Sequence, residues 1–152
     1  METKFYRCPI CGNLVVKIKD SGVTPHCCGK EMILLKPGQV DASHEKHVPT
    51  IECKEKGAYL VKVGSTPHPM TGEHHICFIC LETENGVAFR YLKNGDELSK
   101  EAMATFHTDS DQAKAAFEYC NLHGLWKLDV KEDPCKNVSG KGNDPCIDFC
   151  VF

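Results

Sequence analysis

The sequence has 152 residues, 11 of them cysteine, and its 18 basic and 21 acidic side chains leave a formal net charge of −3. This balance excludes a strongly basic nucleic-acid-binding protein, because phosphate neutralisation needs a dense surface of Lys and Arg. No stretch approaches the roughly 18 apolar residues of a membrane-spanning helix, and the charged start of the sequence has no apolar run typical of a secretory signal. We therefore expect a cytoplasmic protein without membrane contact, in which clustered cysteines bind metal or do redox chemistry more often than they form disulfides.

Residues 1–36 form the first predicted unit. They contain four cysteines, several glycines and little apolar mass, and they end at the turn signal Lys36-Pro37-Gly38. A unit of this size has too small a core to fold without a metal or a partner. We therefore predict a small metal-binding module.

The four cysteines of this module can share one metal ion. Cys8 and Cys11 form a CxxC knuckle, and Cys27 and Cys28 supply two further thiolates. Four thiolates favour a tetrahedral site, which suits zinc and iron alike. The adjacent pair must splay apart to reach one ion, which favours an iron–thiolate centre over a zinc ribbon with two CxxC pairs. The metal either only keeps the module folded or also stores or relays electrons.

Residues 39–130 form the second predicted unit, made mostly of strands. The residue types that favour strands occur in runs bounded by turn residues, at 59–63, 75–81 and 87–92. Asn85 and Gly86 predict a tight hairpin turn between the last two runs, because both accept a positive φ angle. Several short strands at this spacing predict a β-sandwich or barrel.

The end of the chain contains the one predicted helix and a tail. The alanine-rich run Ser110–Tyr119 predicts a short helix, with Asp109 or Ser110 as its N-cap. Residues 131–152 change in composition and are predicted to form a poorly ordered tail. Its three cysteines either form a redox-active pair, bind metal or have no role; they are Cys135, Cys146 and Cys150.

Several histidines of the second unit lie beside turns, glycine or proline, where a ring projects from a constrained loop. Cys120 and His123 are three residues apart in one loop, so both can bind one ion. One such histidine alone is most often a solvated loop residue, but several with one cysteine favour a shared metal. The candidates are His47, His68, Cys120, His123 and either His74 or His75, between which spacing does not decide.

The other cysteines of this unit are predicted to be structural. Residues three apart on a strand point to opposite faces, so Cys77 and Cys80 cannot easily bind one ion. We expect both to be thiols that fill core positions, and we expect the same of Cys53.

Three motifs in the second unit, Glu45–Pro49, Gly64–Met70 and Glu118–Trp126, together with the cysteine spacing of the first unit, resemble the desulfoferrodoxin type of two-iron superoxide reductase. The resemblance covers about residues 4–130. It implies a mainly β protein: a desulforedoxin-like (rubredoxin-like) Fe(Cys)4 module followed by an immunoglobulin-like, neelaredoxin-like β-sandwich, usually in a homodimer.

The resemblance also assigns ligands for two irons. Cys8, Cys11, Cys27 and Cys28 would bind the first, and His47, His68, His74 and His123 with an axial Cys120 would bind the second. The family pattern places a ligand six residues after the histidine of the His-Pro-Met motif, which selects His74 and leaves His75 as a strand residue.

The implied activity is the one-electron reduction of superoxide to hydrogen peroxide at a non-haem iron with one open position, followed by re-reduction by a small protein such as rubredoxin. The axial thiolate would push electron density through the iron. Lys46 would attract the anion and stabilise developing negative charge, and Glu45 would be a displaceable ligand of ferric iron. No haem or nucleotide is implied. Two alternatives remain: a non-enzymatic electron-transfer protein and a zinc-stabilised binding domain.

Overall fold

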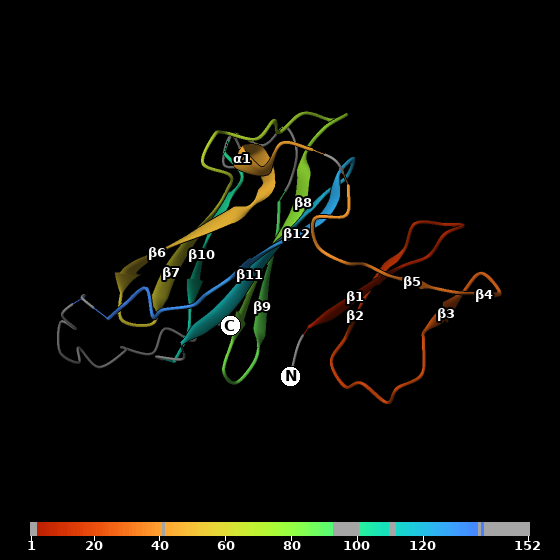
Figure 1. Cartoon of the computed structure of the whole chain (residues 1–152), viewed down its shortest axis with the longest axis horizontal. Helices are drawn as coiled ribbons and strands as arrows, with labels where there is room; N and C mark the ends of the chain where they lie inside the picture. Colours follow the sequence, from red (N-terminus) through yellow and green to blue (C-terminus); the bar gives the residue numbers. More distant parts are fainter. Residues whose placement is uncertain (1–2, 41, 93–100, 110–111, 137, 139–152) are drawn as a thin grey trace, which may run out of the picture.

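The computed structural model describes residues 3–40, 42–92, 101–109, 112–136 and 138 (Figure 1). These residues form a mainly β protein, in which a small group of strands at one side adjoins a larger sandwich (Figure 1). No helix in the described part of the chain is long and apolar enough to cross a membrane.

The N-terminal unit consists of five short strands. They are β1 (Lys4–Arg7), β2 (Leu14–Lys17), β3 (His26–Cys27), β4 (Lys30–Glu31) and β5 (Ile33–Leu34). They form a three-stranded sheet in the order β2-β1-β5 and a separate β3-β4 pair. The buried cluster of this unit contains Tyr6, Cys8 and Met32, with Cys27 packed against it. Two of these four side chains are cysteines, so the unit has very little apolar core of its own.

The larger unit is an antiparallel sandwich, as the immunoglobulin-like prediction requires. Its strands are β6 (Pro49–Glu55), β7 (Ala58–Val63), β8 (Ile76–Thr83), β9 (Val87–Tyr91), β10 (Met103–His107), β11 (Ala113–Cys120) and β12 (Gly124–Asp129). One sheet has the order β10-β7-β6 and the other the order β12-β11-β8-β9. Apolar side chains from both sheets meet in a buried core that includes Val61, Ile79, Leu81, Phe106 and Ala116.

The three predicted strands are confirmed as β7, β8 and β9, with small shifts at their ends. The predicted turn joins β8 to β9, where the Thr83 N–H donates to the Gly86 carbonyl at 2.8 Å. The predicted helix at Ser110–Tyr119 is wrong, because Ala113–Cys120 is strand β11. β11 lies between β8 and β12, and from Ala115 to Cys120 every residue is buried. Pairing and burial on both faces outweigh the helix propensity of alanine.

The N-terminal unit packs on the outer face of the four-stranded sheet. The Phe5 ring lies 5.2 Å from that of Phe117 and 5.7 Å from that of Phe78, between ring centroids. The Thr3 N–H donates to the Glu82 carboxylate at 3.0 Å. One aromatic side chain of β1 is therefore the centre of the contact between the two units.

The structure corrects the prediction for Cys53, which forms a disulfide with Cys135, with the Cα atoms 5.2 Å apart. Cys77 and Cys80 remain free thiols, half-buried and buried respectively. They do not lie on opposite faces, since both border the cluster on the outer side of the four-stranded sheet. A register shift places Ile76 opposite Cys120 and leaves Cys77 unpaired in that ladder, which interrupts the alternation of the strand. The predictions for Cys146, Cys150 and most of the tail lie outside the described residues.

Candidate metal centres

The first centre combines the four cysteines of the N-terminal unit, whose sulfur atoms all lie within 4.8 Å of one another. The Sγ atoms of Cys11 and Cys27 are 3.6 Å apart, and those of Cys27 and Cys28 are 3.8 Å apart. A tetrahedral site with metal–sulfur distances of about 2.3 Å has sulfur–sulfur edges of about 3.8 Å. The sulfur positions therefore fit a single tetrahedral ion.

The adjacent cysteines reach this site because of a tight turn between β3 and β4. Cys27 pairs with Lys30 across the hairpin, and the two residues between them have positive φ, 52° at Cys28 and 74° at Gly29. Positive φ at both central positions defines a type I′ turn. Cys28 is the only non-glycine residue with positive φ in the described part of the chain. This turn allows the neighbouring residues Cys27 and Cys28 to direct both sulfurs toward one ion without distorting the tetrahedral site.

The pKa values of the cysteines also indicate that a cation is needed to ionise the thiols of this centre together. The N–H groups of Cys11 and Ile10 donate to Cys8 Sγ at 3.5 and 3.4 Å, and they lower the pKa of that thiol to about 6. The neighbouring Cys11 thiol, with Cys27 and Cys8, raises the pKa of Cys28 to about 12. The protein alone thus favours the thiolate of Cys8 and the thiol of Cys28. A bound metal ion would be needed to ionise all four.

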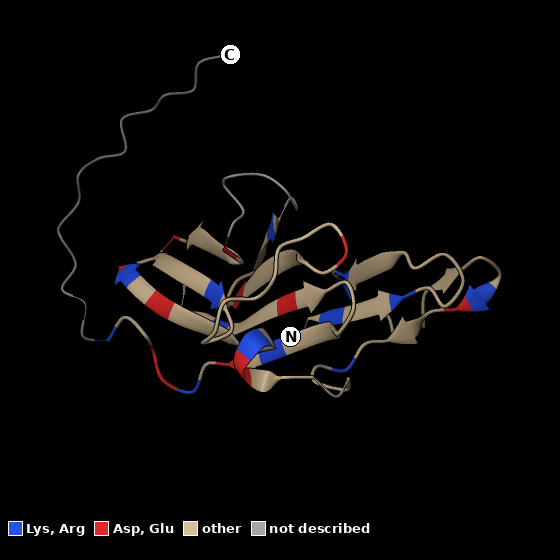
Figure 2. Ribbon diagram, turned by 90° about the horizontal axis from the view of Figure 1, so that it is seen from above, with Lys and Arg blue, Asp and Glu red and all other residues tan. Residues whose placement is uncertain are grey.

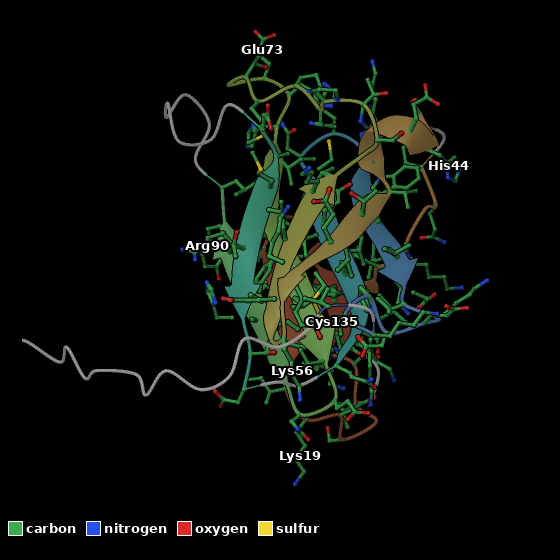
Figure 3. The ribbon with its side chains drawn as sticks, turned by 90° about the vertical axis from the view of Figure 1, so that its left-hand side faces the viewer. Lys19, His44, Lys56, Glu73, Arg90 and Cys135 are labelled. Atoms are coloured by element: carbon green, nitrogen blue, oxygen red, sulfur yellow. A yellow bond between two sulfur atoms is a disulfide. The ribbon has the colours of Figure 1, made fainter. Side chains whose placement is uncertain are left out.

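The second centre lies at one end of the sandwich, the end that Figure 3 marks with His44 and Glu73, opposite the end with Lys56 and Cys135. The structure brings together all five predicted ligands, with donor atoms within 4.8 Å of one another; they are His47, His68, His74, Cys120 and His123. They come from the last residue of helix α1 (His44–His47), the β7–β8 loop, the end of β11 and the β11–β12 turn. Both sheets therefore contribute to the site.

Backbone carbonyl groups orient the rings of His47 and His68. His47 Nδ1 lies 2.8 Å from the Ser43 carbonyl oxygen, and His68 Nδ1 lies 2.7 Å from the Pro69 carbonyl oxygen. Since a carbonyl can only accept, each Nδ1 carries the proton and each Nε2 presents a lone pair. These two Nε2 atoms face each other at 3.2 Å. Two lone pairs at this distance fit a cation placed between them.

The remaining ligands point to the same place. His123 Nδ1 lies 2.9 Å from His47 Nε2 and 3.5 Å from Cys120 Sγ. The Nε2 atom of His74 is buried and has no hydrogen-bond partner in the described structure. Buried polar atoms are almost always satisfied, so an orphaned imidazole nitrogen among other donors fits a metal ligand.

Burial keeps the imidazoles in the form that binds metal. It lowers the pKa of His47 and His74, and it lowers the pKa of His68 to about 4. Neutral imidazole is the metal-binding form. Burial also raises the pKa of the Cys120 thiol. Metal binding must therefore displace the thiol proton, as it does in thiolate sites generally.

Lys46 and Glu45 both lie on α1, the short helix whose ribbon has both blue and red segments in Figure 2. Both residues are exposed and directly precede the buried His47. The positive charge of Lys46 contributes, after burial, to the lowered pKa values of His47 and His74. This contribution is smaller than those of burial and of the His123 charge. Glu45 does not belong to the group of donor atoms.

The α1 turn is held by the loop that follows β7. The N–H groups of Ser65 and Thr66 donate to the Glu45 carbonyl at 2.8 and 3.0 Å, and Gly64 has a φ of 74°. A Cβ atom at Gly64 would lie 2.6 Å from the Glu45 carbonyl oxygen and 2.8 Å from the Lys46 carbonyl carbon. Only glycine allows this close approach.

The sequence prediction missed two residues that position ligands. Trp126 is buried and stacks on His47 with 5.0 Å between ring centroids, and its Nε1–H donates to the His123 carbonyl at 3.1 Å. Asn121 accepts from the His75 N–H at 2.9 Å and donates to the Glu73 carbonyl at 2.8 Å. Asn121 and Trp126 both lie inside the Glu118–Trp126 motif, and this position was the only feature of the sequence that pointed to them.

His75 is not a ligand in this arrangement, and it does not lie in the strand either. It directly precedes β8, which begins at Ile76, and its Nδ1 lies 3.0 Å from the Thr71 carbonyl oxygen. The His74 N–H donates to Thr71 Oγ1 at 3.1 Å. The loop therefore separates the two neighbouring histidines, one toward the centre and one toward its own backbone.

Comparison with known proteins covers both units. The sequence model of the family described as Desulfoferrodoxin matches residues 39–129, and that of the Desulfoferrodoxin N-terminal domain matches residues 1–35. The chain is 45% identical over 126 residues to a desulfoferrodoxin of Syntrophotalea carbinolica, covering 82% of this chain and 94% of that protein. It is 42% identical over 130 residues to a desulfoferrodoxin of Nitratidesulfovibrio vulgaris, covering 85% and 98%.

Among solved structures, the superoxide reductase from Treponema pallidum matches with a TM-score of 0.69 and 33% sequence identity. The match covers 84% of this chain and 99% of that one. The likeness therefore extends over most of this chain and almost the whole of the other.

Proposed function

This chain belongs to the desulfoferrodoxin family, and we propose that it is a superoxide reductase with two iron centres. The reaction is the one-electron reduction of superoxide, in which one superoxide anion, one electron and two protons yield one hydrogen peroxide molecule. Ferrous iron, held by the four histidines and Cys120, would supply the electron.

The observation that carries this proposal is the donor set of the second centre. It contains four imidazoles and one thiol, and no sixth His, Cys, Asp or Glu of the described residues joins the group. Five protein ligands leave one position of an octahedral ion for a small anion, whereas a structural site is closed. The first centre is closed by four sulfurs and is suited to electron transfer or to structure.

Iron content is the first test. We expect two irons per chain and, after pulse radiolysis, rapid reaction of the ferrous protein with superoxide. Zinc in both centres would refute the proposal in favour of a zinc-stabilised binding domain. Iron without reaction with superoxide would favour a non-enzymatic electron-transfer protein. Oxygen evolution during turnover would indicate dismutation rather than reduction.

We propose that Lys46 attracts superoxide to the second centre. The support is its place on α1 beside His47, together with the effect of its charge on the imidazoles. A cation at the mouth of a site raises the encounter rate of an anion and stabilises developing negative charge.

Lys46→Gln should slow the reaction with superoxide about tenfold or more at low ionic strength, with a smaller effect in high salt. The visible spectrum should not change, since Lys46 is not a ligand. Lys56→Gln is the matched control, because Lys56 is exposed at the opposite end of the sandwich (Figure 3). Equal rates for the two variants would remove Lys46 from the mechanism.

We propose that Glu45 is a displaceable ligand of the ferric centre that helps product to leave. The support is the exposed side chain on the helical turn that ends at His47, with a backbone fixed by two hydrogen bonds. Glu45→Ala should alter the spectrum of the ferric protein and leave that of the ferrous protein unchanged. Identical ferric spectra would refute this role.

We also propose that the units 1–36 and 39–130 act as an Fe(Cys)4 module and a catalytic sandwich, in a cytoplasmic homodimer. An external donor such as rubredoxin would return the electron that each turnover consumes. Reduced rubredoxin should re-reduce the ferric second centre in stopped-flow mixing, and ultracentrifugation should give twice the chain mass.

A further inference from the structure

The Cys53–Cys135 disulfide joins β6 to the segment that follows β12, and neither metal centre uses it. The two cysteines are 82 residues apart in the chain. The label of Cys135 in Figure 3 lies near Lys56, at the end of the sandwich opposite His44 and the second centre. Metal binding therefore does not explain the presence of this disulfide.

Few other contacts hold the described residues of this segment, 131–136, to the sandwich. The Val130 N–H donates to the Lys114 carbonyl at 2.8 Å, and beyond it Gln112 donates to the Asp133 carboxylate at 3.1 Å in an exposed position. The ion pair between Lys136 and Glu132 is internal to the segment and exposed. Among the described contacts, the disulfide and the packing of Cys135 against the sandwich core are thus the main attachments of the segment.

Neither cysteine is fully buried, and the contacts of both sulfurs with the Glu55 carbonyl are in exposed positions. Cys53 and Cys135 are half-buried, and Cys53 lies on β6, at the edge of its three-stranded sheet. A register shift between Cys53 and Glu55 marks a bulge at this place. The Glu55 carbonyl oxygen lies 3.1 Å from Cys53 Sγ and 3.8 Å from Cys135 Sγ. After reduction, a proton on either sulfur would therefore have the Glu55 carbonyl nearby as an acceptor.

We propose that Cys53 and Cys135 form a thiol–disulfide exchange site that releases residues 131–136 from the sandwich when a dithiol reduces it. A thiolate of the reductant attacks one sulfur, and its second thiol resolves the mixed disulfide. The reductant becomes a disulfide, and the protein gains two thiols. Hydrogen peroxide reverses the change: it oxidises one thiol to a sulfenic acid with loss of water, and the other thiol displaces a second water.

The first experiment uses the iron-loaded full chain, with dithiothreitol as the dithiol and added hydrogen peroxide as the oxidant, so that it does not depend on superoxide reduction. Dithiothreitol, followed by iodoacetamide and peptide mass spectrometry, should label Cys53 and Cys135 together, while the metal ligands stay unlabelled. Removal of the reductant and addition of one equivalent of peroxide should restore the pair. A disulfide that dithiothreitol opens only after unfolding, or a re-formed bond with a different partner, would overturn the proposal.

The second experiment measures the release of the segment. Trypsin should cut after Lys131 and Lys136 about tenfold or more faster in the reduced protein than in the oxidised one, since cleavage follows the population of the open form. Cys53→Ser should be cut at the fast rate with or without reductant. Cys146→Ser keeps both partners and should behave like the unsubstituted chain. Equal cleavage of oxidised and reduced protein would show that the disulfide does not hold the segment.

Discussion

The N-terminal unit and the sandwich each bring four or five metal ligands together, but by opposite means. In the N-terminal unit the buried cluster is Tyr6, Cys8 and Met32, so a ligand is itself part of the core. In the sandwich the ligands lie at one end of a large apolar core that both sheets supply. We therefore expect the first unit to need its metal to fold, and the second to fold first and so build the site for its metal.

The backbone at the ligands shows the same contrast. Cys27 and Cys28 converge through a hairpin turn with two positive φ angles. His47 instead stacks on Trp126 of the distant strand β12, and the Trp126 Nε1–H donates to the His123 carbonyl three residues earlier in the chain. Local turns shape the first centre, and tertiary contacts shape the second.

Metal removal should separate the two units most strongly. After chelation, β1 to β5 should lose hydrogen-exchange protection, since a structural metal of this kind contributes roughly 10 kcal/mol or more to folding. β8 and β11 should stay protected, because they form the centre of the sandwich. Hydrogen exchange with mass spectrometry measures the protection of both units in one experiment. Reloading with zinc is the control and should restore protection without reaction with superoxide. Persistent protection of the metal-free N-terminal unit would refute the comparison.

Phe5→Ala should uncouple the two units. Phe5 is 3% exposed and packs on Phe78 and Phe117. Loss of a buried phenylalanine costs about 3–5 kcal/mol, which calorimetry should record as an earlier, separate transition of the N-terminal unit. Ile18→Ala is the control, because Ile18 belongs to the same unit and is 88% exposed. A single unchanged transition in Phe5→Ala would show that the units are held together elsewhere.

Gly64→Ala should damage the second centre and spare the first. The added methyl group meets the backbone of Glu45 and Lys46 at a positive φ, a strain of about 1–3 kcal/mol. The α1 turn should shift, slowing the reaction with superoxide, while the absorption of the Fe(Cys)4 centre stays the same. Gly72→Ala is matched to it, since nothing lies within 4 Å of a Cβ at Gly72. Similar rates in both variants would contradict the positioning role of the loop.

The smallest expected effect concerns acid stability of the sandwich. Hydrogen bonds from Lys54 and Lys62 lower the pKa of Glu52 on β6 from 4.5 to about 2. A lowered carboxyl pKa stabilises the fold above the unfolded value, and this contribution disappears as the pH falls from about 4.5 toward 2. Glu52→Gln should therefore lower the melting temperature slightly at pH 7 and not at all at pH 2. Because the Glu52 side chain is 46% exposed, solvent screening keeps the change small. A larger loss at pH 2 than at pH 7 would contradict it.

The candidate sites were largely predictable from the sequence, and the errors have physical causes. The CxxC knuckle and the constrained histidine loops are local signals, because ligand type and turn residues lie together in the chain. The helix predicted at Ser110–Tyr119 failed because alanine propensity is weak against pairing on both edges of β11. Cys77 was predicted on the wrong face of β8 because no local sequence pattern indicates the bulge beside it.

By itself, the sequence determined which residues could bind metal and that the chain is mainly β, and it predicted a first unit too small to fold without a metal or a partner. Only the tertiary structure decided which of Cys53, Cys77 and Cys80 forms a disulfide, since residues 53 and 135 meet through the packing of distant segments. It also showed that His74 faces the centre while His75 turns to its own loop. The same physical reason explains the disulfide and the two histidines. The residue types and short spacings that bind metal can be recognised in the sequence, whereas the direction of a side chain depends on what packs against it.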